Sequence, residues 1–184
     1  MKLIFEAAQQ VQDFFDSQEW RFCFIGGVAL QRWAKPRLTN DIDLTLLTGF
    51  GSEGFFIDKL LERFSSRIKD AKNFALQNRI LLLQINDIGV DISLGGLFFE
   101  ESAVSRAIDY KFLVNVKLRI CTAEDLIVFK AFADRLQDWA DIQSIILVQS
   151  ELDWKYIYKQ LTPLVELKEA PEILQKLEKL RDQH

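Results

Sequence analysis

Histidine is nearly absent from this sequence: 184 residues include one, and it is the last, His184. Mechanisms that need an internal imidazole are therefore excluded, among them Ser-His-Asp triads, Cys-His dyads and zinc sites with histidine ligands. Any chemistry has to depend on carboxylates, lysines, backbone amides or a metal ion held by oxygen atoms.

Cysteines and long apolar runs are scarce as well. The two cysteines, Cys23 and Cys121, both lie in apolar runs, which predicts buried thiols in a reducing compartment. No apolar run approaches the ~20 residues of a membrane span, and the first residues lack the basic and then apolar order of a targeting signal. We therefore expect a cytoplasmic protein without a membrane partner.

Basic charge is not in excess, since 23 Lys and Arg residues stand against 27 Asp and Glu residues, a net charge of −4. This acidic balance argues against a surface built for extended DNA binding. Hydrophobic residues make up 49% of the chain, and a chain of this length buries roughly 70% of its unfolded surface. A full hydrophobic core is therefore expected without disulfide or metal staples.

Apolar periodicity predicts an α+β N-terminal half followed by a helical C-terminal part. Helices are expected in residues 4–15, 28–33 and 56–64, and strands in residues 21–25, 41–46, 79–85 and 90–94, the last two as a hairpin. Thr122 to Asp125 has the pattern of a capping box, and helical spacing continues from there to His184. We predict an α+β core over residues 1–120 and a helical region packed on it over residues 121–184.

Two carboxylates recur in the strand expected from residue 41. Asp41 and Asp43 share one face at a separation of roughly 6.6 Å, while Ile42 lies on the other. Two such carboxylates can flank a pair of magnesium ions about 3.5–4 Å apart. The alternative is an ordinary solvent-facing pair on an edge strand.

A glycine pair, Gly26-Gly27, ends the preceding strand and opens a helix. Backbone N–H groups at such a turn can receive phosphate oxygens, although most glycine pairs are merely turns. Followed at short range by carboxylates that suit a metal, the pair predicts nucleotide chemistry.

These residues resemble a known signature. Gly26-Gly27, then thirteen residues, then Asp41-Ile42-Asp43 within Arg37-Leu38-Thr39-Asn40-Asp41-Ile42-Asp43, is similar to the motif of the polymerase-β-type nucleotidyltransferase superfamily. The sequence most resembles its AbiEii/AbiGii-like branch, to whose helical segment the stretch from Lys130 to Asp141 is similar. The resemblance covers residues 20 to 150.

The resemblance implies a minimal mixed nucleotidyltransferase sheet flanked by helices and a site for two Mg²⁺ ions, with Mn²⁺ as an alternative. Asp41 and Asp43 would bind both metals. Asp91, on the returning strand of the hairpin, would bind the catalytic metal near the acceptor hydroxyl, and would lower the pKa of that hydroxyl or accept the proton from it. A hairpin acid that faces water is the alternative for Asp91. The residues implied in nucleotide binding are Gly26, Gly27, Arg37, Thr39, Lys130 and Asp138.

Lys130 lies beside the apolar stripe of its predicted helix, where a lysine either extends to solvent or meets an anion. On an unbroken helix Asp141 falls about 20° from Lys130, and Asp134 and Asp138 about 40° and about 80° from it. In one interpretation Lys130 contacts the triphosphate while Asp138 and Asp141 position it. In the other these residues form ion pairs on the helix surface, which we favour for Asp134.

Two further groups are weaker candidates. Arg67, Lys69, Lys72 and Arg79, with Phe74 among them, form a loose basic cluster that could contact a nucleic acid or a triphosphate, although a solvated face is favoured. The aromatic residues Phe98, Phe99 and Trp139 could be platforms on which bases stack, but are expected in the core.

The predicted activity is transfer of a nucleoside monophosphate from a nucleoside triphosphate such as ATP to an acceptor hydroxyl. The resembling proteins imply an RNA, a protein or a small molecule as the class of acceptor, and the resemblance also implies a toxin with an antitoxin partner. Gly27 stands where many superfamily members have serine. The alternatives are a non-catalytic nucleotide- or partner-binding module with the same fold and, more weakly, a phosphohydrolase.

Overall fold

The computed structural model describes residues 1–183, so His184, at which the predicted helical region ends, lies outside the described residues. The chain consists of two compact units. The sheet unit comprises Met1–Val28 and Leu38–Cys121, and the helical unit comprises Ala29–Arg37 and the described residues from Thr122 onward. The segment Ala29–Arg37 thus groups with the C-terminal helices, although it lies within the range predicted for the α+β core.

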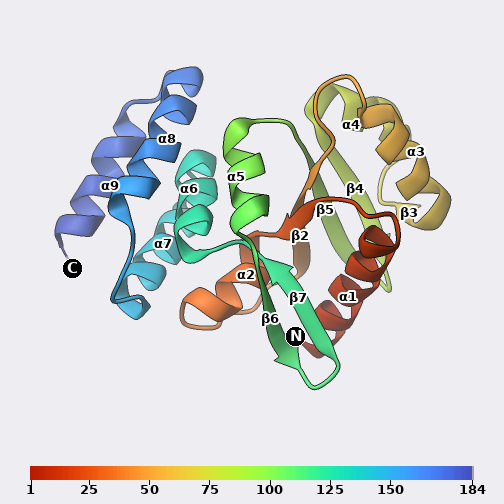
Figure 1. Ribbon diagram of the computed structural model, residues 1–184, viewed down its shortest axis with the longest axis horizontal. Coiled ribbons are helices and arrows are strands. Elements are labelled where there is room, and N and C mark those ends of the chain that lie inside the picture. The colour runs from red at the N-terminus through yellow and green to blue at the C-terminus, as the bar shows by residue number, and fades with distance from the viewer. Residues whose placement is uncertain (184) are drawn as a thin grey trace. The chain divides into compact units, whose positions relative to one another are not determined.

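The sheet unit holds the strands of the described chain (Figure 1). They are β1 (Phe22–Phe24), β2 (Asp41–Leu47), β3 (Ser65–Ser66), β4 (Ile80–Ile85), β5 (Ile88–Gly95), β6 (Ile108–Leu113) and β7 (Val116–Ile120). Its helices are α1 (Lys2–Ser17), α3 (Glu53–Arg63), α4 (Ala71–Asn78) and α5 (Phe98–Arg106), and α2 (Gly26–Trp33) runs from this unit into the helical one. The helical unit continues with α6 (Ala123–Ala133), α7 (Leu136–Val148), α8 (Trp154–Lys168) and α9 (Glu172–Asp182).

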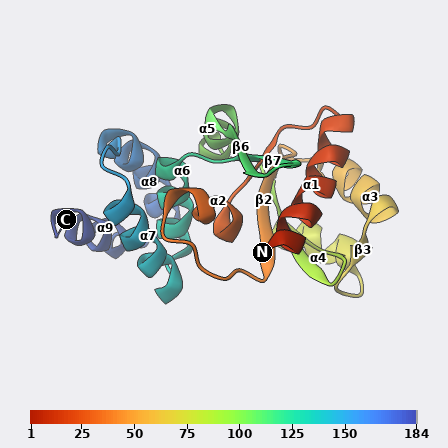
Figure 2. The same cartoon turned by 90° about the horizontal axis from the view of Figure 1, so that it is seen from below.

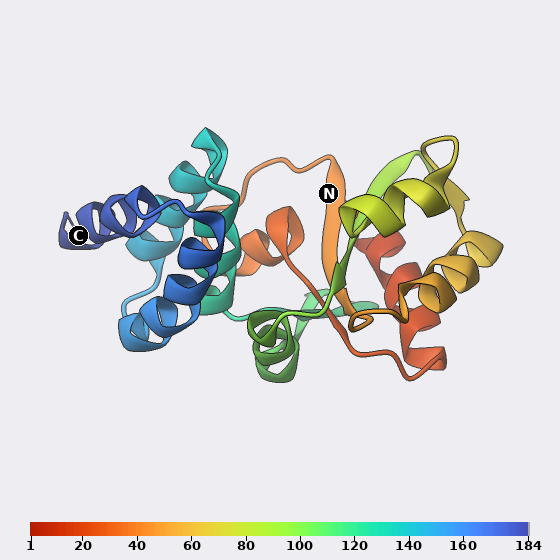
Figure 3. The same cartoon turned by 90° about the horizontal axis from the view of Figure 1, so that it is seen from above.

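The strands form one mixed sheet in the order β3-β4-β5-β2-β1-β7-β6. β2 lies in the middle, antiparallel to β1 and parallel to β5, and Figure 3 shows the orange β2 beside the green β5. This architecture confirms the predicted α+β class with a mixed sheet flanked by helices.

Alternating burial fixes β2 in the sheet. Ile42, Leu44 and Leu46 are completely buried on one face, where Phe24 pairs with Leu44 and Phe22 with Leu46. α1 contacts β2 and β7 (Figure 2). Each fully buried Leu or Ile side chain contributes about 1.5–3 kcal/mol, and a shift of one residue would turn this apolar set outward. The opposite, polar face of β2 is thereby fixed as well.

The predicted hairpin of β4 and β5 is confirmed. The two strands pair antiparallel, with Ile85 opposite Ile88 across a two-residue turn. The turn residues Asn86 and Asp87 have φ angles of 49° and 65°, and a type I′ turn requires positive φ at both positions. This turn matches the twist of the strands, so β5 returns directly beside β4 and presents its other edge to β2.

The structure also differs from the prediction. α4, α5 and the β6–β7 hairpin lie where no element was predicted. Of the three aromatic residues predicted in the core, Phe99 is buried and Trp139 is half-buried, but Phe98 is 89% exposed. The prediction is wrong for Phe98 because Phe98 and Phe99 begin α5, and adjacent helical residues point about 100° apart.

Both cysteines are buried, as predicted, and no disulfide joins them. Of the helices in residues 1–183, none combines the length and the hydropathy that crossing a membrane requires.

α6 is the central element of the helical unit and packs against α7, α8 and α9. It begins where the capping pattern predicted, because the Thr122 side chain accepts a hydrogen bond from the backbone N–H of Asp125 at 3.3 Å. Leu126, Ile127 and Val128 are all completely buried, so several sides of α6 face the interior. A charged side chain on such a helix needs partners inside the unit.

Candidate active site

Three carboxylates lie on one face of the sheet unit. β2 and β5 run parallel in a register that pairs Asp43 with Asp91 and Asp41 with Gly89. Aligned residues of neighbouring strands point to the same face, as do residues two apart on one strand. Asp41, Asp43 and Asp91, the carboxylate row, therefore share the face opposite the buried Ile42.

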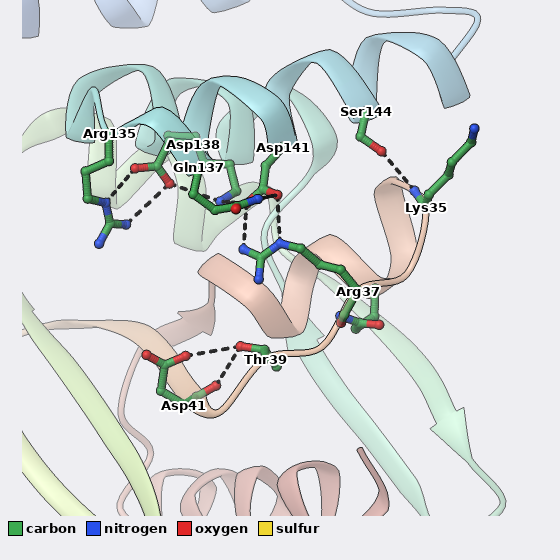
Figure 4. A network of polar contacts seen from close by, with 11 residues as sticks. Lys35, Arg37, Thr39, Asp41, Arg135, Gln137, Asp138, Asp141 and Ser144 are labelled. Atoms are coloured by element: carbon green, nitrogen blue, oxygen red, sulfur yellow. Dashed lines mark hydrogen bonds and ion pairs between the residues drawn. The ribbon is translucent and has the colours of Figure 1, made fainter.

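Asp41, at the exposed start of β2, is held by the segment that precedes the strand. The Thr39 hydroxyl donates a hydrogen bond to Asp41 Oδ1 at 3.1 Å (Figure 4). Thr39 is only 7% exposed, so its hydroxyl has a fixed position. A buried donor thus orients the carboxylate of an exposed residue.

The glycine pair lies directly against this segment. Gly26 has φ of +54°, and a Cβ atom there would lie 2.6 Å from Asp43 Cγ and 2.7 Å from Asp43 Cβ. A Cβ atom on Gly27 would lie 2.7 Å from Thr39 Cβ. Only glycine allows the turn between β1 and α2 to approach the carboxylate row this closely. A serine at position 27, as in many members of the superfamily that the motif resembles, would collide with Thr39.

Arg67 joins the carboxylate row from the segment after β3. Its guanidinium donates a hydrogen bond to Asp91 Oδ1 and forms an ion pair with it. Burial is the main reason that the pKa of Asp91 lies above its usual range. The Arg67 charge opposes this shift, and the nearby Asp41 carboxylate adds to it.

The donor chemistry of the row fits a hard divalent cation. In residues 1–183, no group of three or more His, Cys, Asp and Glu side chains is arranged to hold a metal ion. However, three carboxylates on adjacent strands offer the oxygen ligands that Mg²⁺ takes. Repulsion between Asp41 and Asp91, one cause of the raised pKa of Asp91, is what a cation between them would relieve.

A second charged cluster lies within the helical unit and contains Lys130. Its Nζ atom lies 2.6 Å from Asp141 Oδ2 and 3.2 Å from Asp138 Oδ1. The exposed fractions are 5% for the Lys130 side chain and 3% for each carboxylate. Arg135, at the surface, donates to Asp138 Oδ2 at 2.6 Å. The ammonium of Lys130 is therefore committed to two buried carboxylates.

Arg37 completes this cluster from the segment before β2 (Figure 4). Its Nε and Nη2 atoms donate to the two oxygens of Asp141 at 2.8 and 2.7 Å, a bidentate geometry. Burial opposes ionisation of Asp141, but hydrogen bonds from Arg37, Lys130 and Gln137 outweigh it and lower the pKa of Asp141 to about 2. Asp141 is the carboxylate that Lys130 and Arg37 share.

The helix predicted to run unbroken from Lys130 to Asp141 is in fact two helices. Asp134 has φ of 59°, and this left-handed residue ends α6 at Ala133 before α7 begins at Leu136. The lysine and its carboxylates therefore meet between two packed helices. The alternative of ion pairs on a helix surface is accordingly wrong in its location, because the ion pairs are buried.

Asp134 lies outside the cluster. It pairs with Lys176 at 2.8 Å and accepts a hydrogen bond from Trp139 Nε1 at 2.7 Å. The hydrogen bond from Lys176 is the main cause of its lowered pKa. This is the ion pairing that the sequence favoured for Asp134.

The basic cluster predicted around residues 67–79 does not act as one patch. Lys72 pairs with Asp58 at 2.6 Å, and Arg79 pairs with Glu53. Of the three paired cations Arg67, Lys72 and Arg79, Arg67 alone reaches the carboxylate row. The sequence indicated Arg67 only as one member of a weak basic cluster, because no local pattern distinguishes it from its basic neighbours.

Comparison with known proteins places this geometry in context. The model of the family described as "Nucleotidyl transferase AbiEii toxin, Type IV TA system" matches residues 12–153. No curated protein matches the sequence.

Two solved structures are similar in fold. The antibiotic-resistance factor ANT(2'')-Ia, in its solution structure, has a TM-score of 0.54 at 16% identity, over 91% of this chain and 94% of that chain. The lincosamide antibiotic adenylyltransferase LnuA, in its lincomycin-bound crystal structure, has a TM-score of 0.53 at 12% identity, over 78% of this chain and 97% of that chain. These likenesses confirm the predicted nucleotidyltransferase fold.

The first prediction concerns the glycine turn. Gly26→Ala should lower the free energy of unfolding by more than about 1 kcal/mol, because alanine is strained at positive φ and its Cβ would displace Asp43. Urea unfolding measures the change. Gly54→Ala is the control, since nothing lies within 4 Å of a Cβ there and its φ is not positive. Equal stability of Gly26→Ala and wild type would contradict the required close approach.

The second prediction concerns Lys130. Lys130→Met keeps the aliphatic stem but leaves two buried carboxylates without their ammonium, so the free energy of unfolding should fall by about 3–5 kcal/mol. The exposed Arg135→Met, which loses one ion pair to the same cluster, should cost under about 1 kcal/mol. Similar losses in the two variants would argue against a buried cluster.

The same Lys130→Met protein separates the two interpretations of Lys130, in a nucleotide titration at a temperature where both proteins stay folded. A direct triphosphate contact predicts a rise in the dissociation constant on the order of 10- to 100-fold. A nucleotide affinity within about twofold of wild type would mean that Lys130 binds only the buried carboxylates and not the triphosphate.

The third prediction is a pH dependence from Asp141. Folding lowers the pKa of Asp141 from its ordinary value of 3.8 to about 2. The contribution of Asp141 to stability is therefore present above about pH 4 and lost as the pH falls towards about 2. The stability difference between wild type and Asp141→Asn should therefore shrink by about 2 kcal/mol over this interval. Unfolding curves at each pH measure it, with the exposed Asp58→Asn as control. A stability difference between wild type and Asp141→Asn that stays constant over this interval would show that folding does not lower the pKa of Asp141.

Proposed function

The chain belongs to the AbiEii nucleotidyltransferase toxin family, and from this premise we propose that it transfers a nucleoside monophosphate from a nucleoside triphosphate to an acceptor hydroxyl, with a divalent cation bound at the carboxylate row. The observation that carries the proposal is the parallel register of β2 and β5, which sets Asp43 beside Asp91. An acidic row of this kind suits phosphoryl chemistry because it can hold the cations that neutralise a triphosphate.

Asp41, Asp43 and Asp91 would hold the cation, with Mg²⁺ as the natural occupant and Mn²⁺ as a substitute. When bound, the cation supplies charge neutralisation for the phosphate oxygens and for the leaving pyrophosphate. Support for the site comes from its oxygen-only donors and from the mutual repulsion of Asp41 and Asp91.

The reaction we propose is an in-line displacement at the α-phosphorus. The acceptor oxygen forms a bond to that phosphorus while the bond to the bridging oxygen of the β-phosphate breaks, and pyrophosphate leaves. The proton of the acceptor hydroxyl passes to a carboxylate oxygen of Asp91, which the strand register sets beside Asp43.

Neighbouring groups support these steps. Thr39 holds the Asp41 carboxylate through its hydrogen bond, which fixes one ligand of the proposed cation. Gly26 and Gly27 open α2 beside the row, and the N-terminal end of a helix attracts phosphate oxygens. In the helical unit, the assignment of Arg37, Lys130 and Asp138 to nucleotide binding stays a prediction.

The acceptor is proposed only as a class, namely an RNA, a protein or a small molecule. LnuA is described as a lincosamide adenylyltransferase, but at 12% identity its fold alone bears on this chain. The family description supports a toxin with an antitoxin as partner. A non-catalytic binding module with this fold is the alternative that an assay has to exclude.

Incubation with α-labelled nucleoside triphosphates and a cell extract tests the proposal. Label should enter RNA, protein or a small molecule with release of pyrophosphate, and transfer should stop when the divalent cation is removed by chelation. Nucleotide binding without pyrophosphate release would favour the binding module. Release of inorganic phosphate instead would identify a phosphohydrolase.

The fourth prediction is that Asp41→Asn and Asp43→Asn each reduce transfer below about a tenth of wild type at saturating Mg²⁺, because an amide keeps the shape but lacks the charge that holds the cation. The melting temperature should change little, since both side chains project from the polar face of β2. Asp87→Asn, in the exposed hairpin turn, is the matched control and should retain activity. Near wild-type transfer by Asp41→Asn or Asp43→Asn would exclude that residue from the site.

A further inference from the structure

One row of residues crosses three strands of the sheet unit and ends on a cation, the guanidinium of Arg67. The backbone N–H of Arg67, directly after β3, donates to the carbonyl oxygen of Leu82 on β4 at 3.1 Å. Leu82 pairs with Asp91 on β5, and Asp91 pairs with Asp43 on β2. The guanidinium of Arg67 thus extends across β4 to reach the carboxylate of Asp91.

Gly89 leaves the room that this extension needs. It lies on β5 two residues before Asp91 and opposite Asp41. A Cβ atom on Gly89 would lie 2.7 Å from Arg67 Nη1 and 3.2 Å from Arg67 Cζ. Among the described residues other than the chain neighbours of Gly89, the three atoms nearest to that Cβ position all belong to Arg67. The bare backbone at Gly89 is therefore the surface over which the guanidinium lies.

Arg67 brings a positive charge to an acidic region of the sheet unit. Asp41, Asp43 and Asp91 carry three carboxylates on one face. The two other paired cations of the neighbouring segment are committed elsewhere, Lys72 to Asp58 and Arg79 to Glu53.

We propose that Arg67 is a positioning residue of the site, an internal counter-ion that binds the Asp91 carboxylate in the cation-free protein and that a divalent cation displaces. The inference rests on the cation site of the proposed function. Arg67 and a divalent cation compete for the Asp91 carboxylate, because a cation bound there repels the guanidinium and weakens its contact with Oδ1. Part of the affinity of the row for a cation is therefore used to break the ion pair. Arg67 thereby lowers the affinity of the row for a cation, and in the cation-free protein it reduces the repulsion between the carboxylates of the row.

Direct binding of Mn²⁺, measured as loss of the free-ion signal in electron paramagnetic resonance, tests the proposal without any assay of activity. Arg67→Met should tighten Mn²⁺ binding by about 5- to 10-fold, because the competitor is gone. Gly89→Ala should tighten it in the same direction without changing any charge, since its methyl group takes the place of the guanidinium.

Lys72→Met is the matched control. It removes one positive charge from the same segment, but this lysine pairs with Asp58, so Mn²⁺ affinity should stay within about twofold of wild type. The inference is overturned if Arg67→Met binds Mn²⁺ no more tightly than Lys72→Met, or if Gly89→Ala binds it no more tightly than wild type. Failure of every protein to bind Mn²⁺ would refute the cation site itself, which is a separate outcome.

A measurement on the wild-type protein guards against a variant that fails to fold. The side-chain Nε–H resonance of Arg67, assigned by through-bond correlations in the wild-type protein, should shift as Mg²⁺ is added and should saturate together with Mg²⁺ binding. An Arg67 resonance that does not move at saturating Mg²⁺ would mean that the cation and the ion pair coexist, and the inference would be wrong.

Discussion

The parallel pairing of β2 with β5 is the constraint on which the candidate active site depends. Burial of Ile42 and Leu44 on one face of β2 fixes the strand, because a slip of one residue would place these side chains in water. The same register sets Asp43 beside Asp91. Apolar burial on one side of the sheet therefore determines which carboxylates meet on the other, and the type I′ turn between β4 and β5 delivers the second strand in the correct alignment.

The helical unit handles its charges in a different way. Lys130, Asp138 and Asp141 are almost entirely buried, and ions taken out of water are costly unless every polar atom has a partner. Arg37 supplies two further hydrogen bonds to Asp141, which keeps this carboxylate ionised despite its burial. Such a network adds little net stability compared with apolar packing. It strongly specifies one arrangement, because removal of a member leaves a charge of another member without its partner.

Glycine has two roles in the sheet unit, both set by close approach. At Gly26 the backbone turns against Asp43 with a positive φ, so a side chain is excluded by strain and by collision. At Gly89 the backbone allows an ordinary residue, and only the guanidinium of Arg67 occupies the space. The first glycine builds the turn beside the carboxylates, and the second lets a cation from a distant segment reach Asp91.

The sequence by itself determined the local features: the alternation of β2, the hairpin after it, the glycine turn, and a motif whose family resemblance was confirmed. Each of these depends on residues close together in the chain, where periodicity and turn chemistry carry the information. Only the tertiary structure decided that Asp91 lies beside Asp43, that Arg67 reaches Asp91, and that the helix breaks at Asp134 so that its charges meet in the interior. These outcomes depend on strand register and helix packing between distant segments, which no local pattern encodes.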